Sequence, residues 1–171
     1  MQKIFALLGS LLCVFALAAC GGAKQKELTQ LEQLQINKHY DTAKREIFIK
    51  NFTAAEQALS EITKIDDTNF SVWLDIGVLR TRINKTAEAR DAYKKALKWS
   101  SSAFDKDVNN QTALITNLQS LILLNRAQDA RDLMTKVAKK NPSITTYQEL
   151  AKQNVVDVFL GDRQISDAIV K

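Results

Sequence analysis

Apolar residues recur at intervals of three and four along the chain from residue 27 onward, with hardly any alternation of apolar and polar positions. Intervals of three and four place apolar side chains on one face of an α-helix, whereas a half-buried strand alternates at every second residue. One proline and five glycines among 171 residues leave little material for the tight turns of an all-β fold. The sequence therefore predicts an all-α protein.

The clearest helical segment begins near Asn69 and is interrupted by a short polar break at 84–86. Two helices joined by a turn account for this segment. Small residues stand where the two helices must approach closely, and large residues supply the apolar bulk between them. The small residues are Gly77 and Ala89, and the large ones are Trp73, Ile76, Tyr93 and Leu97.

This order of small and large residues resembles the tetratricopeptide repeat (TPR), a helix–turn–helix unit of about 34 residues. The resemblance implies a right-handed solenoid of antiparallel helix pairs. Arg80 departs from the pattern because a large apolar residue is usual there, and Ser101 stands in place of the usual closing proline. The matching residues are Trp73, Ile76 and Gly77 in the first helix and Ala89, Tyr93 and Ala96 in the second.

An earlier copy of the pattern supplies another second helix, 34 residues upstream. Thr53 and Glu56 have the spacing of a capping box, which predicts where this helix begins. The helix before it has two registers, one with His39 and Glu46 inward and one with Tyr40 inward, and the sequence leaves both open. The apolar residues at the repeat spacing are Ala55, Leu59 and Ile62.

A third copy follows after an insertion of about seven residues, 104–110. The repeats are thus expected at about 36–69, 70–103 and 111–144, and three is the usual minimum because one helical pair cannot bury its own apolar face. Asn117 departs from the pattern. The apolar residues of this copy are Leu114, Leu118, Leu121, Ala130, Met134 and Val137.

Residues 145–171 are expected to cover the last repeat, as the capping helix does in TPR arrays. Thr146 and Glu149 form another capping-box pattern, which predicts a helix that continues to about Leu160 and ends at Gly161. A further short helix is expected within 162–171. The inward stripes of these helices are predicted to be Tyr147, Leu150, Ala151 and Val155, and then Ile165, Ala168 and Ile169.

Residues 1–19 have the pattern of a secretory signal peptide. The apolar run 4–16 follows the cationic Lys3 and is too short to span a hydrocarbon core, which needs roughly 20 residues. The ending Leu17-Ala18-Ala19-Cys20 resembles the bacterial lipobox, in which the cysteine becomes the first mature residue and carries diacylglycerol. The resemblance implies lipid attachment at Cys20.

The predicted mature chain consists of a tether, 20–27, and a TPR domain, 28–171, in which Leu28, Leu31 and Leu34 indicate helix before the first repeat. In the sorting pattern of lipoproteins an aspartate after the cysteine favours the inner membrane. Gly21 therefore implies the outer membrane, facing the periplasm, in an organism with two membranes. In an organism with one membrane, the expected place is its outer face.

No catalytic site, metal site or cofactor is expected. His39 is the only imidazole, and lipidation of Cys20 together with loss of the signal peptide leaves no thiol for nucleophilic catalysis. No glycine-rich phosphate loop is present, and Asp105-Lys106-Asp107 lacks the spaced acids and central glycine of a calcium loop. The chain is therefore expected not to be an enzyme and not to bind a small-molecule substrate.

Two groups of lysines are expected to close second helices, where cations complement the helix dipole. Contact with an anionic membrane surface is the alternative role. The formal net charge of +5 is too small to suggest a nucleic-acid-binding protein. The groups are Lys94, Lys95 and Lys98, and Lys136, Lys139 and Lys140.

The TPR resemblance implies a concave groove, lined by the first helices, that binds a polypeptide segment of another protein. In the third repeat, however, Ile115, Ile122 and Leu123 have an alternative role, which is to pack against the C-terminal helices. The expected groove residues are Tyr40, Lys44 and Phe48, then Leu74, Asp75, Val78 and Arg82, and finally Gln119.

A lipobox-like N-terminus followed by three TPR-like repeats predicts a membrane-anchored TPR scaffold outside the cytoplasm that binds another envelope protein. It resembles TPR lipoproteins that assist type IV pilus assembly or outer-membrane protein assembly. Two alternatives remain: a periplasmic chaperone or holdase for exported clients, and a peptidoglycan-related hydrolase, which would need two carboxylates converging in the groove.

Overall fold

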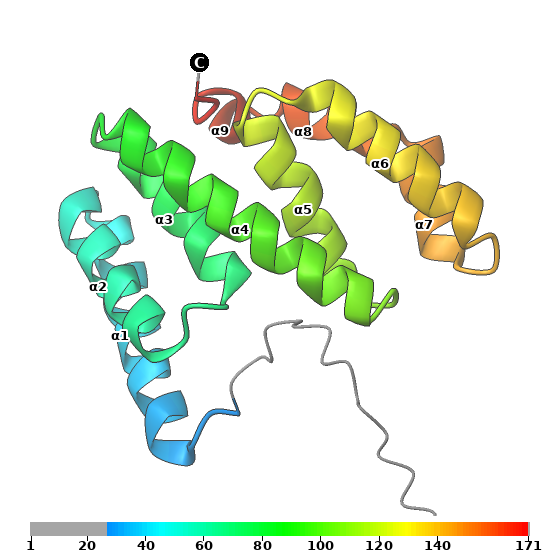
Figure 1. The fold of residues 1–171 in the computed structure, drawn as a ribbon. Coiled ribbons are helices and arrows are strands. Elements are labelled where there is room, and N and C mark those ends of the chain that lie inside the picture. Colours follow the sequence, from blue (N-terminus) through cyan, green and yellow to red (C-terminus); the bar gives the residue numbers. More distant parts are fainter. Residues whose placement is uncertain (1–26, 171) are drawn as a thin grey trace, which may run out of the picture.

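A computed structural model describes residues 27–170, so the predicted signal peptide, Cys20 and nearly all of the tether lie outside the described residues. The described chain is all-helical, as predicted, and contains no strand (Figure 1). Three short helices, α7 (Thr145–Lys152), α8 (Val155–Gly161) and α9 (Arg163–Ser166), follow three helix pairs. The pairs are α1 (Gln30–Phe48) with α2 (Phe52–Ile65), α3 (Phe70–Arg82) with α4 (Thr86–Lys106), and α5 (Gln111–Leu123) with α6 (Ala127–Lys140).

Each helix from α1 to α6 packs against the next one along the chain, and α3 also contacts α5 (Figure 1). The last helices return to the third pair, because α8 packs against α5 and α6, and α9 packs against α5. The apolar residues predicted at the repeat spacing in 55–62, 114–121 and 130–137 are all buried. Helical periodicity therefore identified the core of this stack.

The turns within the three pairs have the same backbone geometry. Lys50, Asn84 and Asn125 all adopt a left-handed conformation, with φ of 61°, 62° and 60°. In each turn, this residue donates its N–H to the carbonyl three residues back, and the next residue donates to the carbonyl five residues back. These hydrogen bonds form the Schellman motif, which ends a helix and reverses the chain within a few residues.

The connections between pairs also match each other. Asp66 accepts a hydrogen bond from the backbone N–H of Thr68, and Asp107 accepts one from that of Asn109. The next residue caps the following helix in both cases: Asn69 accepts from Val72 N, and Asn110 accepts from Ala113 N. The same short sequence pattern thus builds both connections.

The predicted insertion lies within α4 rather than in a separate segment at 104–110. α4 has 21 residues and α2 has 14, so the extra length extends the helix to Lys106. Phe104, on the added part, is buried and packs edge-to-face on Tyr147 of α7, with ring centroids 6.1 Å apart. Tyr147 also donates a hydrogen bond to the carbonyl of Val108. The longer helix therefore holds the C-terminal helices in place.

Two departures from the repeat pattern are explained by polar partners. Arg80 of α3 forms an ion pair with Glu56 of α2 at 2.8 Å, and the Glu56 side chain is only 8% exposed. Asn117 of α5 is buried and donates a hydrogen bond to Ser101 Oγ of α4 at 3.0 Å. A polar side chain is tolerated at these positions because a partner on the neighbouring helix satisfies it.

The first helix combines features of both predicted registers. Ala43, which belongs to both, is buried, and Tyr40 and His39 are both half-buried. The Glu46 side chain is only 14% exposed, whereas Ile47, in the stripe of Tyr40, is 42% exposed. α1 begins at a capping box formed by Thr29 and Glu32, so helix does precede the first repeat as predicted.

Both predicted capping boxes are wrong. α2 is capped by Asn51, which accepts from Ala54 N, while Glu56 turns toward Arg80 instead of reaching back to Thr53. α7 begins at Thr145 without a side-chain cap. The single helix expected from Thr146 to Leu160 is broken at Asn154, whose left-handed backbone, φ 50°, separates α7 from α8.

Gly77 and Tyr93 are the small and large partners at the closest approach of α3 and α4. A Cβ atom at Gly77 would lie 2.2 Å from Tyr93 Cε1, and Tyr93 is fully buried. The position therefore requires a glycine for packing, as the sequence pattern suggested, and not for its backbone conformation.

We expect Gly77→Ala to lower the free energy of unfolding by about 1–3 kcal/mol, because the added methyl group must displace a ring that has no free space. Gly161→Ala is the matched control, since a Cβ there meets nothing within 4 Å. Urea unfolding of both variants measures the difference. Equal stability of the two variants would contradict the close approach.

Candidate functional site

The first-helix face, which we define as the surface formed by α1, α3 and α5, holds the residues predicted to bind a partner. It has two parts that differ in what covers them. One part, on α1 and the adjoining side of α3, is open. The other, between α3 and α5, is covered by the chain's own residues 165–170, which we call the C-terminal segment.

A cleft on α1 forms the open part. Asn37, Tyr40, Asp41 and Lys44 line it, so two of the predicted groove residues lie together here. Asp41 and Lys44 are exposed and lie 3.6 Å apart as an ion pair one helical turn apart. The cleft therefore presents an aromatic ring, an amide and both signs of charge to any molecule that approaches it.

Tyr40 connects this cleft to α3. Burial raises the pKa of its hydroxyl, and the negative charge of Asp75 acts in the same direction, while a hydrogen bond with Asn69 opposes both. Asp75 keeps access to water, but the protein atoms around its carboxylate partly desolvate it and raise its pKa to about 6. The open part thus contains a carboxyl group that changes its charge close to neutral pH.

Two residues of the C-terminal segment fill the covered part. Ala168 is 3% exposed and Val170 is 1% exposed, although they lie outside any helix. Burying a valine side chain contributes about 1.5–3 kcal/mol. The cluster around these two residues comprises Ala89 and Tyr93 of α4 and Leu123 and Leu124 from the end of α5, with Leu74, Val78, Leu97 and Ile165 packed against it.

Hydrogen bonds to the backbone of the C-terminal segment hold it in this place. The N–H of Val170 donates to the carbonyl of Leu123 at 2.9 Å, and the Tyr93 hydroxyl donates to the carbonyl of Ala168 at 3.2 Å. Burial raises the pKa of Tyr93 to about 12, while a hydrogen bond with Thr81 opposes that shift. The hydroxyl therefore stays protonated, and available as a donor, at neutral pH.

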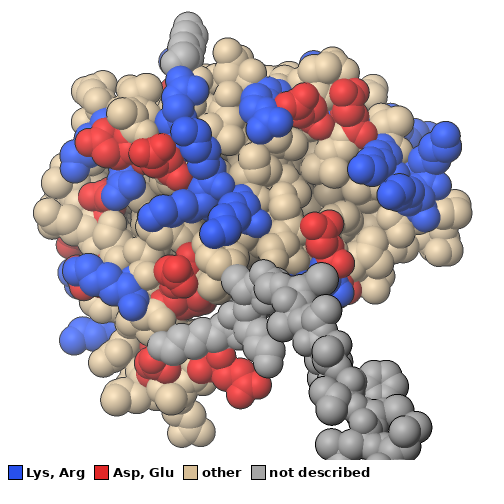
Figure 2. Space-filling model, viewed as in Figure 1, with Lys and Arg blue, Asp and Glu red and all other residues tan. Residues whose placement is uncertain are grey.

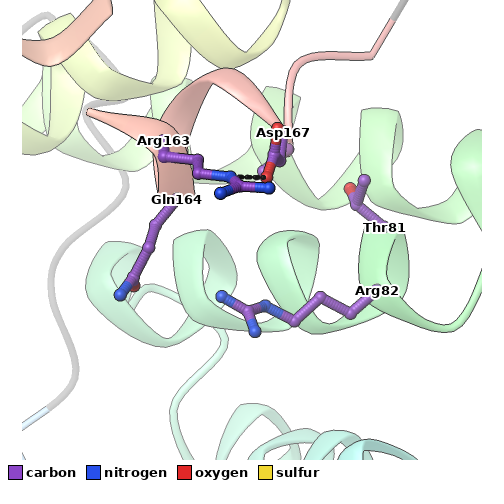
Figure 3. Close-up of a pocket in the computed structure, with 6 residues that line it drawn as sticks. Thr81, Arg82, Arg163, Gln164 and Asp167 are labelled. Carbon is purple, nitrogen blue, oxygen red and sulfur yellow. Dashed lines mark ion pairs between the residues drawn. The ribbon is translucent and has the colours of Figure 1, made fainter. Parts of the chain in front are cut away.

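A cavity of about 600 Å³ lies beside the C-terminal segment, between α3 and α9 (Figure 3). Arg163 and Asp167 lie side by side on one wall of it, one helical turn apart, as an ion pair of 3.6 Å. Arg82, another predicted groove residue, also lines it, and its guanidinium lies 5.2 Å from the ring centroid of Phe52. The remaining lining residues are Thr81, Gln164 and Ala168.

The other predicted groove residues do not share one environment. Leu74 is half-buried between two core clusters, and Val78 packs against the cluster that contains the C-terminal segment. Phe48 is 87% exposed at the end of α1 and lines none of the described clefts, and neither does Gln119 on α5. Of the third-repeat residues, Ile122 and Leu123 have the alternative role, because they pack with the C-terminal helices.

The prediction of a short helix through Ile165, Ala168 and Ile169 is wrong in part, because only Ile165 lies in a helix. α9 ends at Ser166, and the residues after it fold onto α4 and α5 without helical structure. Ala168 is buried, as the predicted inward stripe required, but Val170, which is also buried, was not predicted. The sequence also did not indicate that these two residues lie on the first-helix face, because an apolar run after the last cap does not say which surface it meets.

Basic residues gather over α4, on the side of the molecule that faces the viewer (Figure 2). The lysines at 94, 95 and 98 lie in the middle of α4, so their predicted place at a helix end is wrong. Lys95 instead lies 3.9 Å from the ring centroid of Trp73, and Lys98 lies 4.5 Å from that of Trp99. A shallow cleft here is lined by Arg90, Lys94, Leu97, Lys98, Ser101, Leu124 and Arg126.

Within residues 27–170, no three side chains of histidine, cysteine, aspartate or glutamate gather as a metal site would require. The two acids that line the open cleft and the cavity, Asp41 and Asp167, each pair with a cation. Over the same residues, no helix combines the length and apolar character needed to cross a bilayer.

No protein-family model matches this chain, and no curated protein sequence matches it either.

We expect Asp75→Asn to stabilise the protein increasingly as the pH rises from about 4 to 7. The folded-state pKa of about 6 lies above the ordinary 3.8, so ionisation of Asp75 opposes folding over this range. The variant lacks that opposition and should differ least from the parent near pH 4. Urea unfolding at several pH values measures the difference.

The matched control is Asp105→Asn, on the exposed end of α4. It should show no comparable pH-dependent gain. A gain at Asp75 that is the same at pH 4 and pH 7 would contradict the raised pKa.

Proposed function

We propose that this chain is a membrane-anchored TPR scaffold, exported from the cytoplasm, that binds a segment of another envelope protein on its first-helix face. Assembly of an envelope complex, such as a type IV pilus or the outer-membrane protein assembly machinery, is the process that fits this role. We propose no catalytic activity, cofactor or nucleic-acid partner.

The contact between Gly77 and Tyr93 is the observation that carries the repeat assignment. These residues occupy the small first-helix position and the aromatic second-helix position of the TPR pattern, and their close approach gives both identities a packing reason. The matching turns at Lys50, Asn84 and Asn125 support the same assignment, because equal turns join the two helices of each pair in the same way.

The open part of the first-helix face supports binding of a polypeptide. Its cleft offers Tyr40 for apolar or stacking contact, Asn37 for hydrogen bonds and the Asp41–Lys44 pair for charged side chains. Recognition of an extended or helical peptide uses such a mixture of contacts. A hydrolase would need two carboxylates that converge on a substrate, and Asp41 instead pairs with Lys44.

The lipobox-like sequence before Cys20 supports export and anchoring. Each buried methylene of an acyl chain contributes about 0.8 kcal/mol, and two or more chains give a stable anchor. In an organism with two membranes, Gly21 after the cysteine favours the outer membrane. The scaffold would then present its first-helix face to proteins in the periplasm.

Photo-crosslinking in intact cells tests the proposed partner. A crosslinking amino acid in place of Lys44, in the open cleft, should yield one dominant crosslinked protein. The same amino acid in place of Lys139, exposed on α6, is the control and should yield at least tenfold less of that product. Many clients of similar yield at position 44 would favour a holdase, and identical products from both positions would contradict the proposed face.

Fatty-acid labelling tests the anchor separately. We expect the parent to incorporate a labelled fatty acid and to sediment with membranes, and Cys20→Ser to lose both properties, because the thiol is the lipid acceptor. Cys13→Ser is the matched control and should label as the parent does. Label retained by Cys20→Ser would refute lipid attachment at this residue.

A further inference from the structure

The C-terminal segment is held by contacts that a polypeptide of another sequence could also make. Two of its contacts are hydrogen bonds made by its own backbone groups: the Val170 N–H donates to the Leu123 carbonyl, and the Ala168 carbonyl accepts from the Tyr93 hydroxyl. Backbone groups are the same in every non-proline residue, so these contacts recognise a main chain rather than a particular side chain. Leu123 is the last residue of α5, and its carbonyl lacks an intrahelical partner.

Side-chain recognition in the covered part is limited to two enclosed positions. Ala168 and Val170 are buried two residues apart, and Ile169 between them is only half-buried. Ala168 is 3% exposed, so on the side that packs in the cluster with Tyr93 and Leu123 a longer side chain would have to displace its neighbours. The covered part therefore accepts a small residue and, two positions later, a β-branched apolar one.

The charged side chains around the cavity indicate which residue type the site favours immediately before the small residue. Arg82 of α3, which is not part of the C-terminal segment, lines the cavity together with Asp167, the residue immediately before Ala168. An acidic residue before the small residue is therefore favoured at this position. The pattern acidic, small, any residue, β-branched describes what this site accommodates.

The link between the C-terminal segment and the rest of the fold is weak. No residue of the four-residue helix α9 is buried, and the side chains of Arg163 and Asp167 are 93% and 71% exposed. The segment therefore stays in place mainly through Ala168, Val170 and the half-buried Ile165 and Ile169. Segments with so few buried contacts open more easily than the core does.

We propose that the covered part of the first-helix face is a second binding site for a partner protein, and that residues 168–170 occupy it until a partner segment of the pattern acidic, small, any residue, β-branched displaces them. This inference rests on the proposed scaffold function, which it deepens by naming the chemistry of the bound segment. The open cleft on α1 remains accessible in both states.

The test uses the full chain in detergent micelles and a fluorescent peptide with the sequence of residues 162–170, DRQISDAIV. Val170→Asp should release the C-terminal segment, because a carboxylate cannot be buried among Tyr93 and Leu123 without a partner. Ser166→Asp adds the same charge at an exposed position and is the matched control. Fluorescence anisotropy measures peptide binding, and hydrogen exchange of residues 168–170 measures release.

In Val170→Asp, we expect the backbone amides of residues 168–170 to exchange hydrogen faster than they do in the parent and in Ser166→Asp. We also expect this variant to bind the peptide at least tenfold more tightly than either of those two proteins. Adding Tyr93→Phe to Val170→Asp should weaken peptide binding about fivefold, because the ring remains while the hydroxyl donor is lost. If Val170→Asp lowers the far-ultraviolet helical signal, Val170→Thr, which keeps the shape of valine, is used in its place. Equal binding by the released variant and the parent would overturn the proposal.

Crosslinking from position 44 distinguishes this proposal from the proposed function. A dominant crosslinked protein together with no peptide binding would overturn the second site and leave the scaffold function supported. Peptide binding by the released variant without any crosslinked protein would support the site and contradict the scaffold function. Loss of the crosslinked protein on Val170→Asp would overturn displacement, since the C-terminal segment would then be part of the partner's surface.

Discussion

The absence of a side chain at Gly77 is the constraint on which the rest of this structure depends. It lets the Tyr93 ring lie against α3, so that α3 and α4 pack at close range. That approach also fixes the Tyr93 hydroxyl, which then reaches the carbonyl of Ala168. One glycine thereby sets both the packing of the central helix pair and a contact that keeps the chain's last described residues on the first-helix face.

Repeated turns and caps arrange the three helix pairs, and the one longer helix, α4, positions the C-terminal helices. The turns within and between pairs recur with the same hydrogen bonds, and Schellman turns and asparagine caps need only a few neighbouring residues. The added length of α4 breaks this regularity and places Phe104 against Tyr147. Through that contact α7 is anchored, and the helices after it return along α5 toward α3.

The two parts of the first-helix face offer different kinds of contact. The open cleft on α1 presents exposed charges and a tyrosine, while the covered part offers backbone partners and two small apolar positions. A protein bound only through the open cleft would leave the C-terminal segment in place. A protein that also uses the covered part must displace the C-terminal segment. In our proposal, tighter binding through both parts therefore requires this displacement.

The sequence by itself determined the helices of the three pairs and the buried stripes of α2 to α6, because helix formation and a core stripe depend on neighbours three and four positions away. It did not determine the inward register of α1, the extra turns of α4 or the pairing of Arg80 with Glu56, since each depends on contacts with another helix. Only the tertiary structure decided that Ala168 and Val170 lie against Tyr93 and Leu123. Residues that are distant along the chain meet there, and no local pattern specifies which exposed surface a short apolar segment will cover.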